Sequence, residues 1–400
     1  MTRALSRALL VGVLACAFWL SPAFAALDDT TSAPAPAGIG VDGEGNVFVS
    51  DYALDRLVKF GPDGSVLGQW GTSGVAAGQF SGPFGVAVDG GNSVFVVDQL
   101  NNRVQHFASD GTLLSTWGAA GAGPGDLRTP FGVAVSNGRV YVADFGNDRV
   151  QVFALDGSLL SSFGARGSGD GQFQRPADVA VGPDGTLYVT DHFNDRVERF
   201  SSDGRYQAQL GTLAGAGASQ AAATATSAPT APATPAAALS PTPPTPTTVT
   251  TPTPAASAGA TVTPAGTTTT VPVTSTPAAT AVPSPSAGTP AAPALTPALA
   301  ASADAQLRRP EGIAVDHDGN LWVADYGRDR IVKLAPDGRL LQSLGSRGTD
   351  PGQFVGPKGV AVDPLSGHVY VADTGNGRIQ RLAPDGTPEA SWPMPPTSGS

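Results

Sequence analysis

The sequence predicts an all-β protein, a six-bladed β-propeller built from four-stranded antiparallel blades, and three observations support this fold. A strand-like segment ending in Asp occurs six times, a large apolar residue follows each Asp at a fixed distance, and Gly-containing turns separate the segments. Composition agrees with this prediction. With Gly 51, Pro 36 and only 14% charged residues among 400, the chain differs from a helical enzyme core.

The first residues have the pattern of an export signal, which we predict to span residues 1–25. Two arginines precede an apolar stretch over residues 8–20, and a small-x-small tripeptide ends at Ala25. Attachment as a lipoprotein through Cys16 is the alternative. Cleavage after Ala25 would remove the single cysteine, so the mature chain is expected to have neither a disulfide nor a cysteine-based zinc site. We interpret residues 26–37 as a linker.

Each repeat keeps the same internal spacing. An Arg follows each strand-end Asp by five residues, and a large apolar residue follows it by nineteen. We expect the Asp and Arg to act in packing, as blade-to-blade salt bridges or backbone caps, because six copies of one catalytic pair would have no chemical purpose. We expect the apolar series to fill the wedges between blades. The three series are Asp51, Asp98, Asp144, Asp191, Asp325 and Asp373; Arg56, Arg103, Arg149, Arg196, Arg330 and Arg378; and Trp70, Trp117, Phe163, Leu210, Leu344 and Trp392.

The spacing between repeats identifies an insertion. The apolar residue and the next first strand lie 18 residues apart in four of five cases and 105 apart in the fifth. The extra segment, residues 213–306, is rich in Ala, Pro, Thr, Ser and Gly, and such a composition buries too little apolar surface to fold. We therefore expect a disordered insertion between blades 1–4, residues 38–212, and blades 5–6, residues 307–392. An O-glycosylated stalk and an unmodified spacer both fit it.

The two ends of the repeat array predict how the ring closes. Residues 388–392 supply a fourth strand for the last blade, whereas residues 27–37 have no strand pattern. We therefore expect no exchanged closing strand, a seam held by side-chain packing, and a disordered tail over residues 393–400. Both halves of the array are expected to form one propeller, because neither four blades nor two would close alone.

Four short strands in a repeat of about 47 residues are typical of a propeller blade. The motif residues also resemble NHL repeats: Pro83-Phe84-Gly85-Val86-Ala87-Val88, Val142-Ala143-Asp144, Asn147-Asp148-Arg149-Val150-Gln151 and Gly171-Gln172-Phe173. This resemblance implies a six-bladed propeller that serves as a binding scaffold. The family includes extracellular sensor domains of bacterial receptor kinases, RNA-binding modules of tripartite-motif proteins, and a few lyases and hydrolases, so fold alone does not select a function.

Catalytic motifs are sparse. The four histidines occupy different levels of their repeats, so they are not expected to converge on one zinc ion. The chain contains no GxSxG elbow, P-loop or HExxH sequence. We therefore expect no catalytic residues, no metal and no cofactor. A metal-assisted lactonase or lyase on the same fold, built from scattered carboxylates, is the alternative.

The candidate site consists of positions that vary between repeats while the scaffold residues stay fixed. One position follows the Pro that begins each first strand, and the other follows each strand-end Asp. Both are expected at the upper mouth of the central channel, where aromatic and charged side chains suit a protein, peptide or glycan ligand. The candidate residues are Phe84, Phe131, Glu311 and Lys358 at the first position, and Tyr52, Phe145, His192 and Tyr326 at the second.

Charge and hydropathy limit the partners. A formal net charge of −10 argues against a nucleic-acid partner, which calls for a basic surface. No stretch after the export signal approaches the roughly 20 apolar residues of a membrane span, so none is expected in the mature chain. We expect a monomeric protein that is secreted or associated with the cell surface or cell wall.

Overall fold

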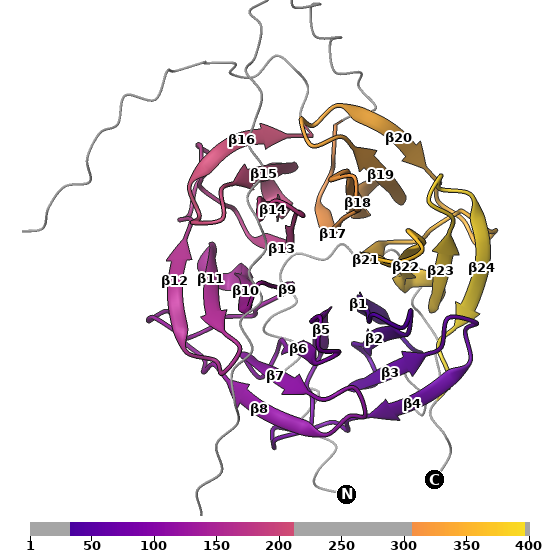
Figure 1. The fold of residues 1–400 in the computed structure, drawn as a ribbon, viewed down its shortest axis with the longest axis horizontal. Helices are drawn as coiled ribbons and strands as arrows, with labels where there is room; N and C mark the ends of the chain where they lie inside the picture. Colours follow the sequence, from indigo (N-terminus) through magenta and orange to yellow (C-terminus); the bar gives the residue numbers. More distant parts are fainter. Residues whose placement is uncertain (1–32, 212–305, 397–400) are drawn as a thin grey trace, which may run out of the picture. The chain divides into compact units, whose positions relative to one another are not determined.

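The computed structural model describes residues 33–211 and 306–396, which form one compact unit. The predicted export signal, most of the insertion and the last four residues lie outside this range. The described residues fold into six four-stranded sheets, each with its strands in sequence order, and this confirms the predicted six-bladed propeller. Figure 1 shows the six blades arranged in a ring, with the first strand of each nearest the centre and the fourth at the outside.

The strands follow the repeats. Blade 1 contains β1 (Pro36–Val41), β2 (Val47–Asp51), β3 (Arg56–Phe60) and β4 (Val66–Trp70). Blade 2 contains β5 (Pro83–Val88), β6 (Val94–Asp98), β7 (Arg103–Phe107) and β8 (Leu113–Trp117). Blade 3 contains β9 (Val133–Ser136), β10 (Arg139–Asp144), β11 (Arg149–Ala154) and β12 (Leu159–Phe163).

The other three blades repeat this arrangement on both sides of the insertion. Blade 4 contains β13 (Pro176–Val181), β14 (Leu187–Asp191), β15 (Arg196–Phe200) and β16 (Tyr206–Leu210). Blade 5 contains β17 (Pro310–Val315), β18 (Leu321–Asp325), β19 (Arg330–Leu334) and β20 (Leu340–Leu344). Blade 6 contains β21 (Pro357–Val362), β22 (Val369–Asp373), β23 (Arg378–Leu382) and β24 (Pro388–Pro393). Single 3-10 turns follow four second strands: η1 (Phe145–Asn147), η2 (His192–Asn194), η4 (Tyr326–Arg328) and η5 (Thr374–Asn376).

The hydrophobic core is divided into six clusters, one between each pair of neighbouring blades. The cluster between blades 4 and 5 joins residues on both sides of the insertion, including Val197, Leu210, Ile313 and Val323. Blades 4 and 5 therefore share one core, as predicted. The large apolar residue that ends each fourth strand belongs to these clusters, which confirms its role as a wedge between blades.

Trp392 illustrates why each wedge residue requires a glycine in the turn that it covers. Its indole stacks on Phe60 of blade 1, with ring centroids 6.0 Å apart. It also covers the Asp63-Gly64 turn, where a Cβ on Gly64 would lie 2.3 Å from the indole nitrogen. Gly64 has a φ of +84°, so this position requires glycine for both its backbone conformation and its contact.

The ring closes without an exchanged strand. Blade 6 takes all four strands from the C-terminal end, and β1 pairs with β2 of its own blade. Blade 1 begins at Pro36, two residues earlier than the expected boundary at residue 38. The expected tail boundary at residue 393 needs a larger correction, because the ordered chain continues past β24 and crosses to blade 1.

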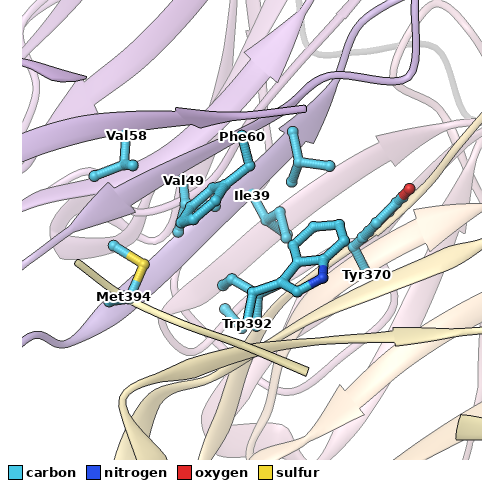
Figure 2. Packing of buried hydrophobic residues seen from close by; sticks show 10 residues of the cluster. Ile39, Val49, Val58, Phe60, Tyr370, Trp392 and Met394 are labelled. Atoms are coloured by element: carbon cyan, nitrogen blue, oxygen red, sulfur yellow. The ribbon is translucent and has the colours of Figure 1, made fainter. Parts of the chain in front are cut away.

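Met394 is the reason that the chain continues. In the other five blade interfaces, a buried residue of the loop before the first strand fills the core next to the upper face, the face on which first strands begin. These residues are Phe80, Leu127, Phe173, Leu307 and Phe354. Blade 1 is the first blade of the array, and Met394 fills this place among Ile39, Val49 and Phe60, as Figure 2 shows. The seam is also held by hydrogen bonds, since Arg56 donates to the carbonyl oxygens of Pro395 and Pro396.

Candidate functional site

The strand-end Asp and its Arg fix the backbone that carries the candidate site. In blade 3, Arg149 Nε donates to Asp144 Oδ2 at 2.8 Å, and its Nη2 donates to the carbonyl oxygens of Gly123 and Asp126 in the preceding loop. The other Asp144 oxygen, Oδ1, accepts the backbone N–H of Arg128 at 2.8 Å. All six Asp side chains are buried and pair with the Arg of their own blade at 2.7–3.1 Å.

This arrangement corrects one part of the prediction. The ion pairs lie within blades rather than between them, because each Asp on the second strand faces its Arg on the third strand directly across the sheet. The Asp side chains do cap backbone N–H groups, which was the other role expected for them. The residue after each Asp therefore lies at a fixed place on the upper face, the face on which first strands begin and second strands end.

Five predicted site residues form a continuous aromatic arc across blades 1–4. The ring centroids of Tyr52 and Phe84 are 6.2 Å apart, and those of Phe84 and Phe131 are 4.4 Å apart. Phe131 stacks on Phe145 at 4.0 Å with 12° between the ring planes, and Phe145 meets His192 edge-on at 6.1 Å. Positions far apart in the sequence thus produce one contiguous surface at the channel mouth.

The other three predicted residues join this arc through a lysine. Lys358 Nζ lies 3.8 Å from Glu311 Oε2, and it lies 4.9 Å from the Phe84 ring centroid and 5.8 Å from that of Tyr326. Such distances are those of cation–π contacts. All eight predicted residues therefore belong to one cluster around the upper mouth.

Burial divides the cluster into supporting and accessible residues. Phe84, Glu311 and His192 are buried, so their side chains hold the surface from beneath. Tyr52 is 37% exposed, whereas Phe131, Phe145, Tyr326 and Lys358 are half-buried. Two exposed apolar residues of this face were missed from the sequence: Leu100 and Phe193, each 47% exposed. Each follows a strand-end Asp by two residues, so extending the comparison of repeats by one position would have found them.

The channel beneath the mouth is narrow. Its walls are the first strands of the six blades, and they enclose about 30 Å³, which is room for about two water molecules. Glycine at the second position after the Pro permits this close approach. A Cβ at Gly38 would lie 2.0 Å from the carbonyl oxygen of Phe84, and one at Gly359 would lie 2.4 Å from that of Ala37.

Asp178 is the exception in this series, since the other five blades have Gly38, Gly85, Gly132, Gly312 and Gly359 at its position. Its carboxylate accepts the backbone N–H of Val179 at 2.8 Å and that of Ile313 at 3.1 Å. Burial, together with the nearby negative charge of Glu311, raises the pKa of Asp178 to about 7. Five glycines and one acid at equivalent positions were the sequence signal for this residue, and the prediction missed it.

His192 contributes a neutral ring to the wall of the mouth. Its Nδ1 lies 3.2 Å from the carbonyl oxygen of Pro310, which fits an N–H donor at that nitrogen. Burial lowers the pKa of His192, opposed by the negative charge of Glu311, while Arg309 and Lys358 lower it further. The imidazole is therefore uncharged at neutral pH.

Two searches of the described residues concern metals and membranes. Within residues 33–211 and 306–396, no group of three or more His, Cys, Asp or Glu side chains is placed to hold a metal ion. The same residues contain no helix of the length and hydropathy needed to cross a membrane.

The comparisons agree with the architecture. The family model for the NHL repeat matches residues 127–153, 173–200, 307–334 and 354–382, in blades 3, 4, 5 and 6. Four matched repeats in a ring of six equivalent blades define an NHL-repeat β-propeller. The chain therefore contains NHL repeats, matched in four of the six blades of its propeller.

Three solved structures of low sequence identity are similar to this chain. A streptogramin B lyase is 12% identical, with a TM-score of 0.50, 92% of this chain covered and 85% of that chain. A virginiamycin B lyase from Staphylococcus aureus is 14% identical, with coverage of 92% and 87% and a TM-score of 0.48. A gluconolactonase from Xanthomonas campestris is 15% identical, with coverage of 86% and 84% and a TM-score of 0.47. At these identities the likeness concerns the fold alone.

Proposed function

We propose that this protein is an exported, non-enzymatic binding module that takes a protein, peptide or glycan ligand at the upper channel mouth. The signal pattern of residues 1–25 supports export. The observation that carries the proposal is the accessible aromatic surface over a channel that holds about 30 Å³. A ligand would lie across the mouth instead of entering the channel.

The accessible side chains suit such a ligand. Tyr52, Leu100 and Phe193 stand exposed around an aromatic arc whose inner members are already packed. Aromatic side chains of this kind are common anchors in binding surfaces, because they bury a large area with few rotatable bonds. The buried Phe84 and Glu311 would act indirectly, by keeping the surface rigid.

A metal-assisted lactonase or lyase is the second candidate, and the channel residue Asp178 favours it. A carboxyl group with a pKa of about 7 can accept or donate a proton at neutral pH, as acid–base catalysis requires. A hydrolase and lyase screen of the purified protein, with and without EDTA, separates this candidate from a binding module. Turnover that EDTA abolishes would contradict the binding proposal.

The direct experiment is to probe peptide and glycan arrays with the mature protein and then to measure affinity for the best ligand with single variants. Tyr52→Ala and Phe193→Ala should each weaken binding by about 2 kcal/mol, roughly 30-fold, if each is an anchor. Leu365→Ala is the matched control, because Leu365 is an exposed apolar residue of the opposite, lower face. Equal affinity of all three variants would refute the site and leave the aromatic arc as packing.

A further inference from the structure

The two residues before the Pro that leads into each first strand differ between the two halves of the upper face. In blades 3, 4 and 5 these positions hold Arg128, Arg175, Arg308 and Arg309, whereas blades 1, 2 and 6 have only small, apolar or hydroxyl residues there. Arg128, Arg308 and Arg309 are exposed, and Arg175 is half-buried. We name these four residues the arginine crescent. The exposed Tyr52 and Leu100 lie on blades 1 and 2, outside it.

The backbone fixes the positions of Arg175 and Arg309. Arg175 and Arg309 have φ values of +62° and +49°, and their backbone N–H groups donate to Asp148 and Asp195 of the preceding blade. This left-handed conformation is costly for a residue with a Cβ, but the hydrogen bond to the neighbouring blade holds it. The guanidinium carbon of Arg175 consequently lies 5.3 Å from the centroid of the Phe145 ring.

Arg309 occupies the equivalent place one blade further on. Burial lowers the pKa of His192, which takes the position of Phe145 in its blade, and the positive charges of Arg309 and Lys358 add to this effect. The cationic and aromatic surfaces are therefore interleaved at the mouth rather than separated on the rim.

The crescent lacks internal counterions. Among residues 33–211 and 306–396, no carboxylate forms an ion pair with any of its four guanidinium groups. Asp148 and Asp195 accept backbone N–H groups instead, and the nearby Glu311 faces Lys358. Four arginines without an ion pair thus gather on one face of a chain of net charge −10, and they favour an anionic ligand.

We infer that the ligand of the upper face is an acidic peptide segment of a partner protein, one that carries carboxylates next to a large apolar side chain. The inference rests on the proposed binding function and names its ligand. Carboxylates would pair with the crescent, in the bidentate geometry that guanidinium groups allow. The apolar side chain would pack near Tyr52, Leu100 and Phe145; the aliphatic Leu100 favours a peptide over a sugar, since sugars stack on flat rings.

The test uses fluorescence anisotropy with a fluorescein-labelled peptide of repeated Glu-Glu-Leu-Trp units. Peptides with Gln or Lys in place of Glu are the matched probes. The acidic peptide should bind at least tenfold more tightly than either, and its affinity should fall as NaCl rises from about 50 to about 300 mM. The double variant Arg175→Glu/Arg309→Glu should weaken it about tenfold or more, because two attractions at the mouth become repulsions.

Further variants and probes distinguish the acidic ligand from the proposed binding function. Arg139→Glu/Arg339→Glu makes the same change in net charge at exposed arginines of the lower face, and it should leave affinity within about twofold. Equal binding of the acidic and Gln peptides would overturn the acidic ligand and leave the binding function standing. Failure of every peptide would overturn the acidic peptide, and failure of the glycan array as well would overturn the binding function. Tighter binding of a heparin fragment, lost in the crescent variant, would replace the acidic peptide by a sulfated glycan.

Discussion

Glu198 should make this propeller less stable as the pH rises, and the repeat itself provides the comparison. Seven residues after the strand-end Asp, blades 2, 3 and 6 have Gln105, Gln151 and Gln380. Gln151 Nε2 donates to the carbonyl oxygen of Asp126 at 2.7 Å and to Asp144 Oδ2 at 3.2 Å. Blade 4 has Glu198 at this position, fully buried. An ionised carboxylate there would lack the donor that the amide provides.

In its protonated, neutral form, Glu198 can supply the hydrogen-bond donor that an ionised carboxylate lacks. Burial raises its pKa to about 8, with the negative charge of Asp191 adding to the rise and the positive charge of Arg196 opposing it. Arg196 Nη2 lies 3.0 Å from Glu198 Oε1, but the same guanidinium group also pairs through its Nε with the buried Asp191. A protonated carboxyl can donate as Nε2 does, so Glu198 imitates the glutamine of the other blades.

The direction of the pH effect follows from the two pKa values. The folded state binds this proton up to about pH 8, whereas the unfolded state releases it near the ordinary value of 4.5. The stabilising effect of Glu198 protonation is therefore complete below about pH 4.5 and is lost between about pH 4.5 and 8. At about 1.4 kcal/mol per pH unit, the loss amounts to about 4–5 kcal/mol, or roughly 10 °C in melting temperature for a domain of this size.

The assay is thermal unfolding, followed by circular dichroism, of the wild type and Glu198→Gln from about pH 5 to about pH 8.5. The two proteins should melt within about 2 °C of each other at the acidic end, and the variant should be more stable by roughly 10 °C at the alkaline end. Gln151→Glu is the matched variant, since it places a carboxyl group at the same position of blade 3, and it should create the same dependence. Parallel pH curves for the wild type and Glu198→Gln would refute the reasoning.

Two further predictions concern the construction of the ring. Met394→Ala should lower the free energy of unfolding by about 2–5 kcal/mol, because Met394 fills the core between blades 6 and 1, and deuterium uptake should rise first in those blades; uniform uptake across all blades would contradict this role. Replacing residues 214–303 with a short Gly/Ser turn should leave the melting temperature unchanged or slightly higher, because shortening the connection from 105 to 18 residues saves about 1.5 kcal/mol of loop-closure entropy; loss of folding would show that the segment is structural.

The blade number and the place of the insertion could be read from the sequence because each depends on a local register. The strand-end Asp, the Arg five residues later and the apolar residue nineteen later are all fixed within one blade. Met394 could not be found in this way. Its counterpart Phe354 follows Leu344 by ten residues, whereas Met394 follows Trp392 by two, so the two residues share no spacing in the repeat.

The sequence predicted where the candidate site residues lie in the repeat, but not which of their side chains are exposed. Repeat position places Phe84 and Tyr52 on one face, but only packing around the channel decides that Phe84 is buried and Tyr52 exposed. The direction of Arg175 likewise depends on a hydrogen bond to Asp148 of the neighbouring blade, which no single repeat contains. Contacts between blades therefore decide which of the variable residues a ligand can reach.

Those contacts also explain how an acidic protein can present a cationic site. On the lower face, aspartates such as Asp63 accept the N–H and hydroxyl groups of their own turns, and these hydrogen bonds lower the pKa of Asp63. Such carboxylates remain ionised, and together they supply much of the net charge. At physiological ionic strength a charge is screened over about 8 Å, so the lower face contributes little potential at the arginine crescent. A short acidic segment at the mouth would respond mainly to Arg175, Arg309 and Lys358. A long polyanion that extends beyond the mouth would also meet the acidic remainder of the surface, which favours a compact acidic ligand over nucleic acid.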